Sequence, residues 1–385
     1  MFENVNLVVG AGISGAVIAA NIAHKLDEKV LIIDKKNHCA GNCYDFKDKN
    51  GITIHKFGSH IFHTSDERVW QFLSRYAHFN TYMHRVFALI DGVETTIPFN
   101  FNTLYDVFPK TLAKKLEKKL LDNFAYNTKV PILDFQKSKD KDLNFLADYI
   151  YKKVFLNYTI KQWGLRPAEI DKNVTSRVPV MISCDNRYFQ DKYQGIPVCG
   201  YTKMIENMLE SPNIEVKTGA NFNDFKNLKF KRIFYTASID EFFDYQLGVL
   251  PYRSVSFKFE EYERPYYQKN SVVNYPDNYD FTRIHEYKYY LNENSAKTVI
   301  AKEYSSEFQL GQNERYYPIV NEKNTTLYNQ YKYLAADLDN VWFLGRLGDY
   351  KYYDMDKAAA RALECFDEVF NKKINITSER YVNKD

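Results

Sequence analysis

The stretch Val5-Asn6-Leu7-Val8-Val9-Gly10-Ala11-Gly12-Ile13-Ser14-Gly15 decides the fold of this 385-residue chain. Residues 5–9 predict a short buried strand, and residues 16–26 predict a helix. The apolar run from Val30 to Ile33 predicts a second strand, which ends at Asp34. The order strand, glycine-rich turn, helix, strand is that of a βαβ unit.

Each glycine of this stretch has a physical reason. Gly10 permits the tight turn, Gly12 lets the backbone approach a pyrophosphate, and Gly15 lets helix and strand pack closely. We expect the pyrophosphate beside Ile13 and Ser14, because free N–H groups and the helix dipole favour negative charge at a helix N-terminus. Asp34 is placed to accept a hydrogen bond from a ribose hydroxyl. The sequence therefore predicts a dinucleotide-binding unit.

Two further segments favour FAD over NAD as the dinucleotide. Residues 35–42 resemble the loop that many flavoproteins place after the ribose acid, so Lys35 and Asn42 are candidate cofactor contacts. Near the C-terminus a strand at 341–344 leads through a turn at 345–349 into a helix at 355–370. In flavoproteins of this architecture such a segment returns to the cofactor, and the helix N-terminus faces the flavin.

Composition excludes several classes of protein. The chain has 52 Lys+Arg against 49 Asp+Glu, net +3, with the two signs interspersed, which gives no footprint for nucleic acid. Its five cysteines are an odd number, which favours free thiols in a reducing compartment. Cys39 and Cys43 lack a second Cys/His pair, so no metal site is expected. No signal peptide is apparent, and the apolar stretch 7–20 is too short to span a membrane, so we expect a cytoplasmic protein without membrane insertion.

The rest of the chain predicts lobes interleaved with the dinucleotide domain. Residues 105–165 read as mostly helical, with Leu112, Leu116 and Leu120 at helical spacing. Residues 252–304 carry short aromatic and β-branched runs that predict antiparallel strands. We expect a first part of the FAD-binding domain at 1–80 and a mainly helical lobe at 81–175. Residues 176–330 would hold the return of the FAD domain and the substrate sheet, and 331–385 the last part of the FAD domain.

Several motifs, in order along almost the whole chain, resemble those of the prokaryotic UDP-galactopyranose mutases. The carriers of the resemblance are His55-Lys56-Phe57-Gly58-Ser59-His60-Ile61-Phe62-His63-Thr64, Tyr158-Thr159-Ile160-Lys161-Gln162-Trp163-Gly164, Arg177-Val178-Pro179-Val180, residues 188–197, Tyr252-Arg253-Ser254, Thr282-Arg283-Ile284, Tyr316-Tyr317-Pro318, Gly345-Arg346-Leu347 and residues 350–355.

The resemblance implies an α/β protein in three parts. These are a Rossmann-like FAD-binding domain, an inserted helical lobe with a mobile substrate loop, and a six-stranded antiparallel sheet. The implied enzyme is an isomerase that interconverts UDP-galactopyranose and UDP-galactofuranose for cell-surface polysaccharide biosynthesis. The FAD must be reduced, by an external reductant such as NAD(P)H, and its N5 attacks the anomeric carbon. The implied assembly is a homodimer.

The resemblance also implies roles for individual residues. Arg177 and Arg283 would grip the diphosphate, since the arginine fork binds phosphate oxygens bidentately. Tyr188, Tyr317 and Tyr352 would add hydroxyl donors, Tyr158 would stack on the base, and Trp163 would belong to the mobile loop. Further substrate contacts are His84, Thr159, Arg253, Asn274 and Asp354.

On the flavin side the implied contacts are His60, Ile61, Arg346 and Met355. The N-terminus of the helix that begins at Met355 would stabilise negative charge on the reduced flavin. His63 is a candidate catalytic residue. For His60 and His63 a structural hydrogen-bonding role and an acid–base role stay open.

Departures from the family pattern concern the substrate. His84 stands where relatives place Asn, Ser176 where they place a basic residue, Met181 where they place Arg, and Ala40 where Gly is usual. UDP-galactose is the first expectation, and UDP-N-acetylgalactosamine or dTDP-fucose is the alternative. Ordinary sequence drift would also explain the changes. Rival functions are a flavin oxidoreductase of the amine-oxidase type and a non-catalytic flavoprotein.

Overall fold

The computed structural model describes residues 2–166 and 179–381. Its first layer is a five-stranded parallel sheet in the order β11-β2-β1-β12-β18. The strands are β1 (Asn6–Val9), β2 (Val30–Asp34), β11 (Ile214–Thr218), β12 (Arg232–Tyr235) and β18 (Val341–Phe343). Their arrangement confirms the predicted Rossmann-like α/β domain, and the strands come from three distant parts of the chain.

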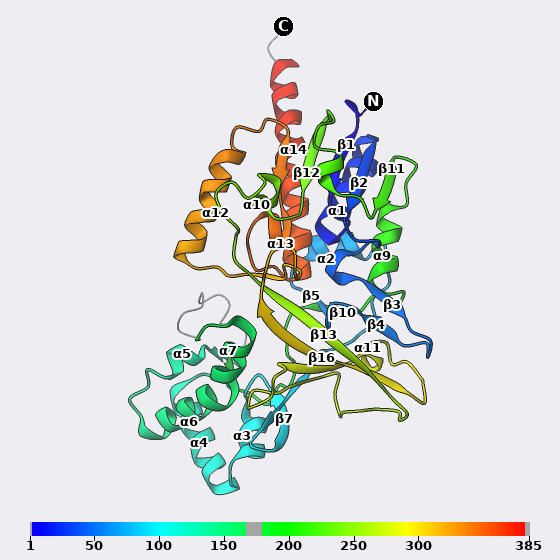
Figure 1. The fold of residues 1–385 in the computed structure, drawn as a ribbon. Helices are drawn as coiled ribbons and strands as arrows, with labels where there is room; N and C mark the ends of the chain where they lie inside the picture. The colour runs from blue at the N-terminus through cyan, green and yellow to red at the C-terminus, as the bar shows by residue number, and fades with distance from the viewer. Residues whose placement is uncertain (1, 167–178, 382–385) are drawn as a thin grey trace.

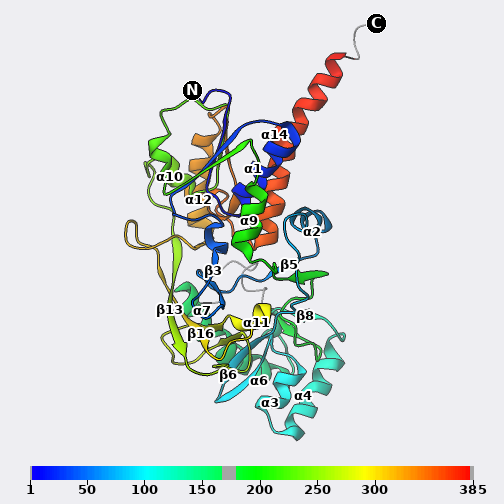
Figure 2. The ribbon, with the colours of Figure 1, turned by 90° about the vertical axis from the view of Figure 1, so that its right-hand side faces the viewer.

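Helix α1 (Ile13–Leu26) follows β1 directly and packs against the long C-terminal helix α14 (Met355–Tyr381). The hydroxyl of Ser14 donates to the carbonyl of Ala358, 3.3 Å away. Alanines at 16, 19, 20, 23, 358, 359 and 362 are buried in this core, and such small side chains let the two helices approach closely. Figures 1 and 2 show the C-terminal end of α14 projecting beyond the rest of the molecule.

A second sheet separates this domain from a helical lobe, which lies at the lower left of Figure 1. The sheet has seven strands in the order β17-β13-β16-β15-β14-β6-β7. They are β6 (Val86–Ile90), β7 (Val93–Ile97), β13 (Tyr252–Tyr262), β14 (Val272–Asn274), β15 (Arg283–Glu286), β16 (Thr298–Glu307) and β17 (Tyr317–Pro318).

The prediction of a six-stranded antiparallel sheet is wrong in strand number and in one pairing. The hairpin β6–β7 joins the edge of β14, and β14 and β6 run parallel, with Val273 opposite Phe87 and Asn274 opposite Ala88. The other neighbouring pairs are antiparallel. Nothing local in the sequence of the hairpin specifies a partner almost two hundred residues away, so the parallel junction was not foreseen.

The helical lobe contains α3 (Phe101–Val107), α4 (Lys110–Asn123), α5 (Ile132–Phe135), α6 (Lys141–Ile150), a π-helical segment η2 (Tyr151–Leu156) and α7 (Asn157–Trp163). Leu116 and Leu120 of α4 are buried and Leu112 is partly buried in the core of the lobe, as their helical spacing predicts. The carboxylate of Asp140 caps α6 by accepting from the amides of Asp142 and Leu143. α7 continues η2 without a break and carries Tyr158, Thr159 and Trp163.

The remaining elements connect these layers, and most of them are short. The helices are α2 (Glu67–Leu73), α9 (Tyr201–Leu209), α10 (Ile239–Phe242), α11 (Lys288–Leu291), α12 (Glu322–Ala335) and α13 (Gly345–Gly348), with the 3-10 turns η1 (Gly41–Cys43) and η4 (Phe222–Asp224). The strands are β3 (Asp45–Lys47), β4 (Thr53–His55), β5 (Phe62–Thr64), β8 (Lys129–Val130), β9 (Val180–Met181) and β10 (Tyr193–Gly195).

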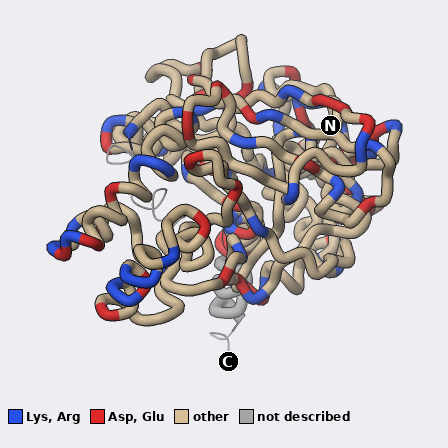
Figure 3. Tube along the Cα trace, turned by 90° about the horizontal axis from the view of Figure 1, so that it is seen from below, with Lys and Arg blue, Asp and Glu red and all other residues tan. Residues whose placement is uncertain are grey.

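Two properties of the whole molecule match the composition. Both Lys and Arg (blue) and Asp and Glu (red) are spread over the trace in Figure 3, as the balanced charge of the sequence predicts. Among the described residues, no helix is both long enough and apolar enough to cross a membrane.

Candidate active site

The first of two large cavities lies at the carboxyl ends of β1 and β2. It is lined by the predicted cofactor residues Gly10, Gly12, Ile13, Ser14, Asp34, Lys35, Asn42, His60, Arg346 and Met355. Ligands of open parallel sheets bind at this edge, because the loops between strands and helices meet there. The cavity therefore lies where the βαβ unit would hold a dinucleotide.

The glycines of the turn fit a pyrophosphate. A methyl group at Gly15 would lie 1.9 Å from the carbonyl oxygen of Gly10, so Gly15 serves the packing of α1 on β1 and lies behind the cavity wall. A methyl group at Gly12 would meet nothing nearer than the Cα of Gly41, 3.8 Å away, and would project into space that the backbone leaves free. No acidic side chain lies in the first turn of α1, and Gly12 provides no side-chain cap, so the helix N-terminus can receive an anion.

Asp34 is held in place for a ribose. One carboxylate oxygen accepts from the amide of Ala11 and the other from the amide of Lys36, both at 2.8 Å. Ala40, which departs from the family pattern, has a φ of +71° and is fully buried. This left-handed conformation favours glycine, so an alanine here carries some backbone strain.

The second cavity meets the first at four residues, His60, Arg346, Asp354 and Met355, which line both. The second cavity lies between the seven-stranded sheet and α7, and ten predicted substrate residues line it: His84, Tyr158, Thr159, Trp163, Tyr188, Asn274, Arg283, Tyr317, Tyr352 and Asp354. Ile61 and His63 also line it. A cofactor in the first cavity would therefore present its inner end to a ligand in the second.

Arg283 lies on the floor of the second cavity and is paired from behind. Its Nε is 3.1 Å from Oε1 of Glu303, which lies opposite it on β16, and the Glu303 side chain is 6% exposed. Burial raises the pKa of Glu303, but the Arg283 charge and a hydrogen bond from His285 outweigh this and lower it to about 2. The ionised carboxylate fixes the guanidinium from one side and leaves the other side for an anion in the cavity.

Aromatic side chains line the cavity beside this arginine and beside Arg346, whose guanidinium lies over the rings of Tyr317 and Tyr352. The Tyr158 ring lies 5.8 Å from the guanidinium carbon of Arg283. Tyr317 and Tyr352 stack on each other with centroids 5.0 Å apart, and Trp163 lies 5.7 Å from Tyr317. The cavity therefore combines a cation with stacking faces and phenol hydroxyls, which suits a nucleoside diphosphate.

His63 and His60 lie toward the first cavity. Nδ1 of His63 is 2.8 Å from a carboxylate oxygen of Asp191, Nε2 is 4.0 Å from Asp354, and the ring stacks on Phe189 at 3.6 Å. The hydrogen bond from His63 is the main cause that lowers the pKa of Asp191 to about 2. His60 donates from Nδ1 to the carbonyl of Gly58, and burial lowers its pKa to about 3, so it is a neutral ring at neutral pH.

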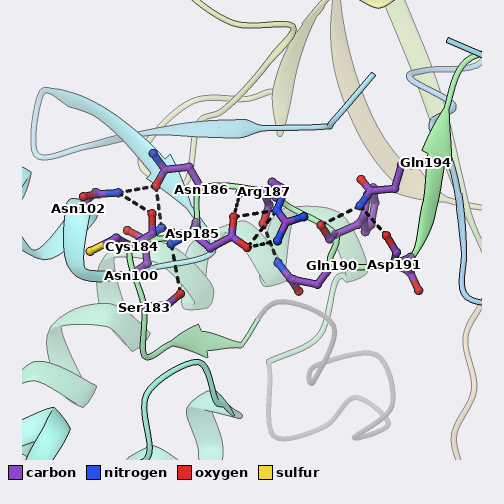
Figure 4. A network of polar contacts seen from close by, with 11 residues as sticks. Asn100, Asn102, Ser183, Cys184, Asp185, Asn186, Arg187, Gln190, Asp191 and Gln194 are labelled. Carbon is purple, nitrogen blue, oxygen red and sulfur yellow. Dashed lines mark hydrogen bonds and ion pairs between the residues drawn. The ribbon is translucent and has the colours of Figure 1, made fainter. Parts of the chain in front are cut away.

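A polar network holds the segment that carries Tyr188 and Phe189 (Figure 4). Asp185 accepts two hydrogen bonds from the guanidinium of Arg187 through Oδ2, at 2.7 and 3.0 Å. Gln194 donates to the carbonyls of Phe189 and Asp191. His84 packs against this segment, 5.8 Å from the Tyr188 ring, and burial lowers its pKa to about 3.

Two of the sequence expectations do not fall on the cavity. Arg253 lines neither cavity among the described residues, and its guanidinium donates to the carbonyls of Gln162 and Lys161 and to the hydroxyl of Ser305. It therefore anchors the C-terminal end of α7. Met181 is buried in β9 and pairs with Lys129, away from the cavity walls. Arg177 and Ser176 lie outside the described residues.

Sequence reasoning missed Glu303, His285 and Ser59. A signal for Glu303 exists. It follows the buried run Thr298–Ala301 in the same strand, and a carboxylate buried in such a strand requires a buried partner. His285 stands two residues after Arg283, so the two side chains share one face of β15. Ser59 carries no such signal, since its place in the wall depends on a turn folded against the sheet.

Comparisons with known proteins agree with this geometry. A family model described as UDP-galactopyranose mutase matches residues 153–352, and a model of an NAD(P)-binding Rossmann-like domain matches residues 8–76. The dTDP-fucopyranose mutase of Escherichia coli is 36% identical over 93% of this chain and 96% of its own length. The UDP-galactopyranose mutase of Mycoplasma genitalium is 37% identical over 91% of each chain.

The fold has a match among solved structures as well. A crystal structure of reduced UDP-galactopyranose mutase superposes with a TM-score of 0.71 at 14% identity, covering 96% of this chain and 94% of that one. At that identity the likeness concerns the fold, while the family model and the relatives above 30% identity establish the kinship. The chain belongs to the UDP-galactopyranose mutase family, a family of FAD-dependent isomerases.

Proposed function

We propose that this protein interconverts UDP-galactopyranose and UDP-galactofuranose. The observation that carries the proposal is the cavity around Arg283, which meets the dinucleotide cavity at His60, Arg346, Asp354 and Met355. A nucleotide sugar with its diphosphate on Arg283 would have its sugar at this junction. A flavin oxidoreductase of the amine-oxidase type has no need of an arginine and stacking aromatics arranged for a nucleoside diphosphate.

The proposed cofactor site is built by the chain's own groups. Gly10, Gly12, Ile13 and Ser14 would hold the pyrophosphate, and Asp34, with Lys35 and Asn42 near it, would hold the ribose. Reduced FAD held by these residues would supply the nucleophile for the anomeric carbon. Arg346 lies at the junction, donating to the carbonyl of Tyr353 at 2.6 Å, and the N-terminus of α14 begins beside it at Met355. Both place positive potential where a reduced flavin would carry negative charge.

Substrate binding and leaving-group stabilisation fall to the second cavity. Arg283, together with Arg177, would hold the diphosphate as UDP departs and returns, because charge develops there in the transition state. Tyr188, Tyr317 and Tyr352 would donate phenol hydroxyls to the same oxygens, and Tyr158 would stack on the base. Asn274 has a buried carbonyl oxygen without a partner among the described residues, and it can accept from a ligand hydroxyl or N–H.

His63 is the proposed proton carrier. Its Nδ1 is fixed on Asp191, so Nε2 faces the junction near Asp354 and can exchange a proton with a sugar hydroxyl. His60 is neutral and bonded to Gly58, which supports a positioning role. Arg253 supports the site indirectly, by holding α7 in place. Thr159, on the same helix, lines the cavity and would contact the nucleotide.

A second substrate follows from two observations. The dTDP-fucopyranose mutase is as similar to the chain as the UDP-galactopyranose mutases are. His84, one of the departures from the family pattern, lines the cavity wall beside Tyr188. The alternative is therefore the same ring contraction on dTDP-fucopyranose or UDP-N-acetylgalactosamine.

The proposal extends to the setting of the enzyme. The five cysteines are free thiols, which supports a reducing, cytoplasmic compartment. We include an external reductant such as NAD(P)H, a homodimer, and furanose supply for cell-surface polysaccharide. Size-exclusion chromatography with light scattering tests the dimer, and bleaching of the flavin absorbance by NADH or NADPH tests the reductant.

The deciding experiment uses FAD-loaded protein reduced with dithionite. It is given UDP-galactopyranose, UDP-N-acetylgalactosamine and dTDP-fucopyranose separately, and products are separated by anion-exchange chromatography. We expect a furanose product without consumption of reductant, and Arg283→Met should abolish it. The matched control is Arg68→Met, at an exposed arginine of α2 paired with Asp367. No furanose from any of the three substrates refutes the proposal.

A further inference from the structure

A buried polar chain leads from the wall of the second cavity to the back of Arg283. The Ser59 hydroxyl, which lines the cavity, is 2.5 Å from Nδ1 of His285. Nε2 of His285 is 2.9 Å from Oε2 of Glu303, whose Oε1 faces Nε of Arg283 at 3.1 Å. His285 is 1% exposed and lines neither cavity among the described residues, so it acts through its neighbours.

The directions of these hydrogen bonds follow from the charges. The pKa of Glu303 is lowered to about 2, so its carboxylate is ionised and can only accept. Nε2 of His285 therefore carries the hydrogen, and since burial lowers the pKa of this histidine, its Nδ1 is an acceptor. The Ser59 hydroxyl must then donate to Nδ1, which leaves its oxygen to accept from the hydroxyl of Tyr290. Every donor points toward Glu303, an arrangement in which each bond polarises the next.

Ser59 belongs to the loop that separates the two cavities. Gly58 has a φ of +85°, and a methyl group there would lie 2.9 Å from the Phe257 ring and 3.7 Å from Oε2 of Glu303. The loop backbone is therefore packed directly over the carboxylate. His60, the next residue after Ser59, lines both cavities, and its amide donates to Nδ1 of His55 at 3.1 Å. A movement of the loop at His60 would alter the Ser59 bond to His285, and through it the carboxylate that pairs with Arg283.

We propose that Ser59 and His285 are positioning residues that couple the diphosphate site at Arg283 to the cofactor-side loop at His60. A diphosphate bound to Arg283 weakens the pairing of the guanidinium with Glu303. The Glu303 carboxylate then depends more on its hydrogen bond from His285, which Ser59 supports in turn. Reduction of a flavin held in the first cavity would change the charge beside His60, which lines both cavities, and would act on the same hydrogen-bonded residues through Ser59. The inference rests on the proposed function in one respect, the assignment of a diphosphate to Arg283.

The test measures binding of UDP to FAD-loaded protein in both redox states, by calorimetry under anaerobic conditions. We expect the dissociation constants of oxidised and dithionite-reduced wild type to differ by about fivefold or more, the range of ordinary coupling between sites. His285→Leu and Ser59→Ala should bring the ratio close to one. His285→Gln should keep most of it, because an amide can donate to Glu303 and accept from Ser59. By linkage, saturating UDP should shift the flavin midpoint potential in the wild type and in His285→Gln. It should not shift the potential in His285→Leu or Ser59→Ala.

The matched control is Glu286→Gln. Glu286 is buried on the same strand as His285, but it accepts from the amides of Tyr267 and Gln268 and faces the other side of the sheet. A wild-type ratio of one overturns the proposal, and so does a ratio that persists in Ser59→Ala. Ser59 is half-buried and tolerates truncation, so Ser59→Ala decides the test even if His285→Leu does not fold. Loss of the ratio in Glu286→Gln also overturns it, by showing general loosening of β15. UDP binding needs no turnover, so this result is separate from the furanose assay.

Discussion

Removing the charge of Arg283 should destabilise the protein more than removing the charge of Glu303. Arg283→Met leaves a carboxylate that is 6% exposed without its cation, and a broken buried pair costs about 3–5 kcal/mol. Glu303 keeps hydrogen bonds from His285 and from the Thr282 hydroxyl, so we expect the lower end, about 3 kcal/mol. Glu303→Gln leaves an arginine that is 23% exposed and faces the open cavity, so its cost should be smaller.

Thermal unfolding of FAD-loaded protein measures the difference. An unfolding entropy of about 2.1 cal/mol/K per residue gives the 385-residue chain about 0.8 kcal/mol/K, so a loss of about 3 kcal/mol lowers Tm by about 4 °C. The double variant Arg283→Met/Glu303→Gln should recover at least half of that loss, because the buried charge is gone. Its affinity for UDP should stay as low as that of Arg283→Met, about tenfold or more below wild type, since a charged hydrogen bond is worth about 1.5–3 kcal/mol.

Two results would refute this reasoning. One is a Tm of Arg283→Met within about 1 °C of wild type, which corresponds to about 1 kcal/mol and would mean that Glu303 is not held by the arginine. The other is a double variant that is no more stable than the single one. Recovery of UDP binding in the double variant would contradict the placement of the diphosphate on Arg283.

Three further predictions concern pH, cofactor and base. Burial lowers the pKa of His84 from 6.5 to about 3. Between these two pH values His84 is protonated in the unfolded chain and neutral in the folded protein. Stability should therefore fall as the pH drops from about 6.5 to about 3, and His84→Gln should reduce the slope of ΔG against pH by about 1.4 kcal/mol per pH unit. Gly12→Ala should fold with an unchanged circular dichroism spectrum but retain FAD about tenfold less well in dialysis. Gly51→Ala meets no neighbouring atom but strains a backbone with a φ of +76°, so it should lose some stability and still retain FAD. Tyr158→Ala should weaken UDP binding by about 1–3 kcal/mol in titration calorimetry and Tyr158→Phe should not, because stacking needs the ring and not the hydroxyl.

Local patterns in the sequence predicted the dinucleotide domain well. The first strand is observed at Asn6–Val9 within the predicted 5–9, and the second at Val30–Asp34. Glycine spacing constrains backbone geometry directly, which is why three residues were enough. The helix after the turn begins earlier than predicted, at Ile13, because the glycine-rich turn itself enters the first helical turn.

Long-range features were beyond such patterns. The parallel junction of β14 with β6 depends on packing between segments far apart in the chain, and so do the pairing of Glu303 with Arg283 and the support of α7 by Arg253. The resemblance placed Arg253 among the substrate contacts by its neighbours in the sequence. A motif identifies a residue that matters and does not say which atoms it touches.

The π-helical segment Tyr151–Leu156 sets the rotational phase of α7. In an α-helix each residue turns the chain by 100°, so a change of one residue in η2 would rotate everything after it by more than a quarter turn. Tyr158, Thr159 and Trp163 would then leave the cavity together, although none of them had been altered. The length of this segment is therefore more restricted than its composition. An insertion of one residue that a loop of the helical lobe would tolerate would inactivate the enzyme if it fell in this segment.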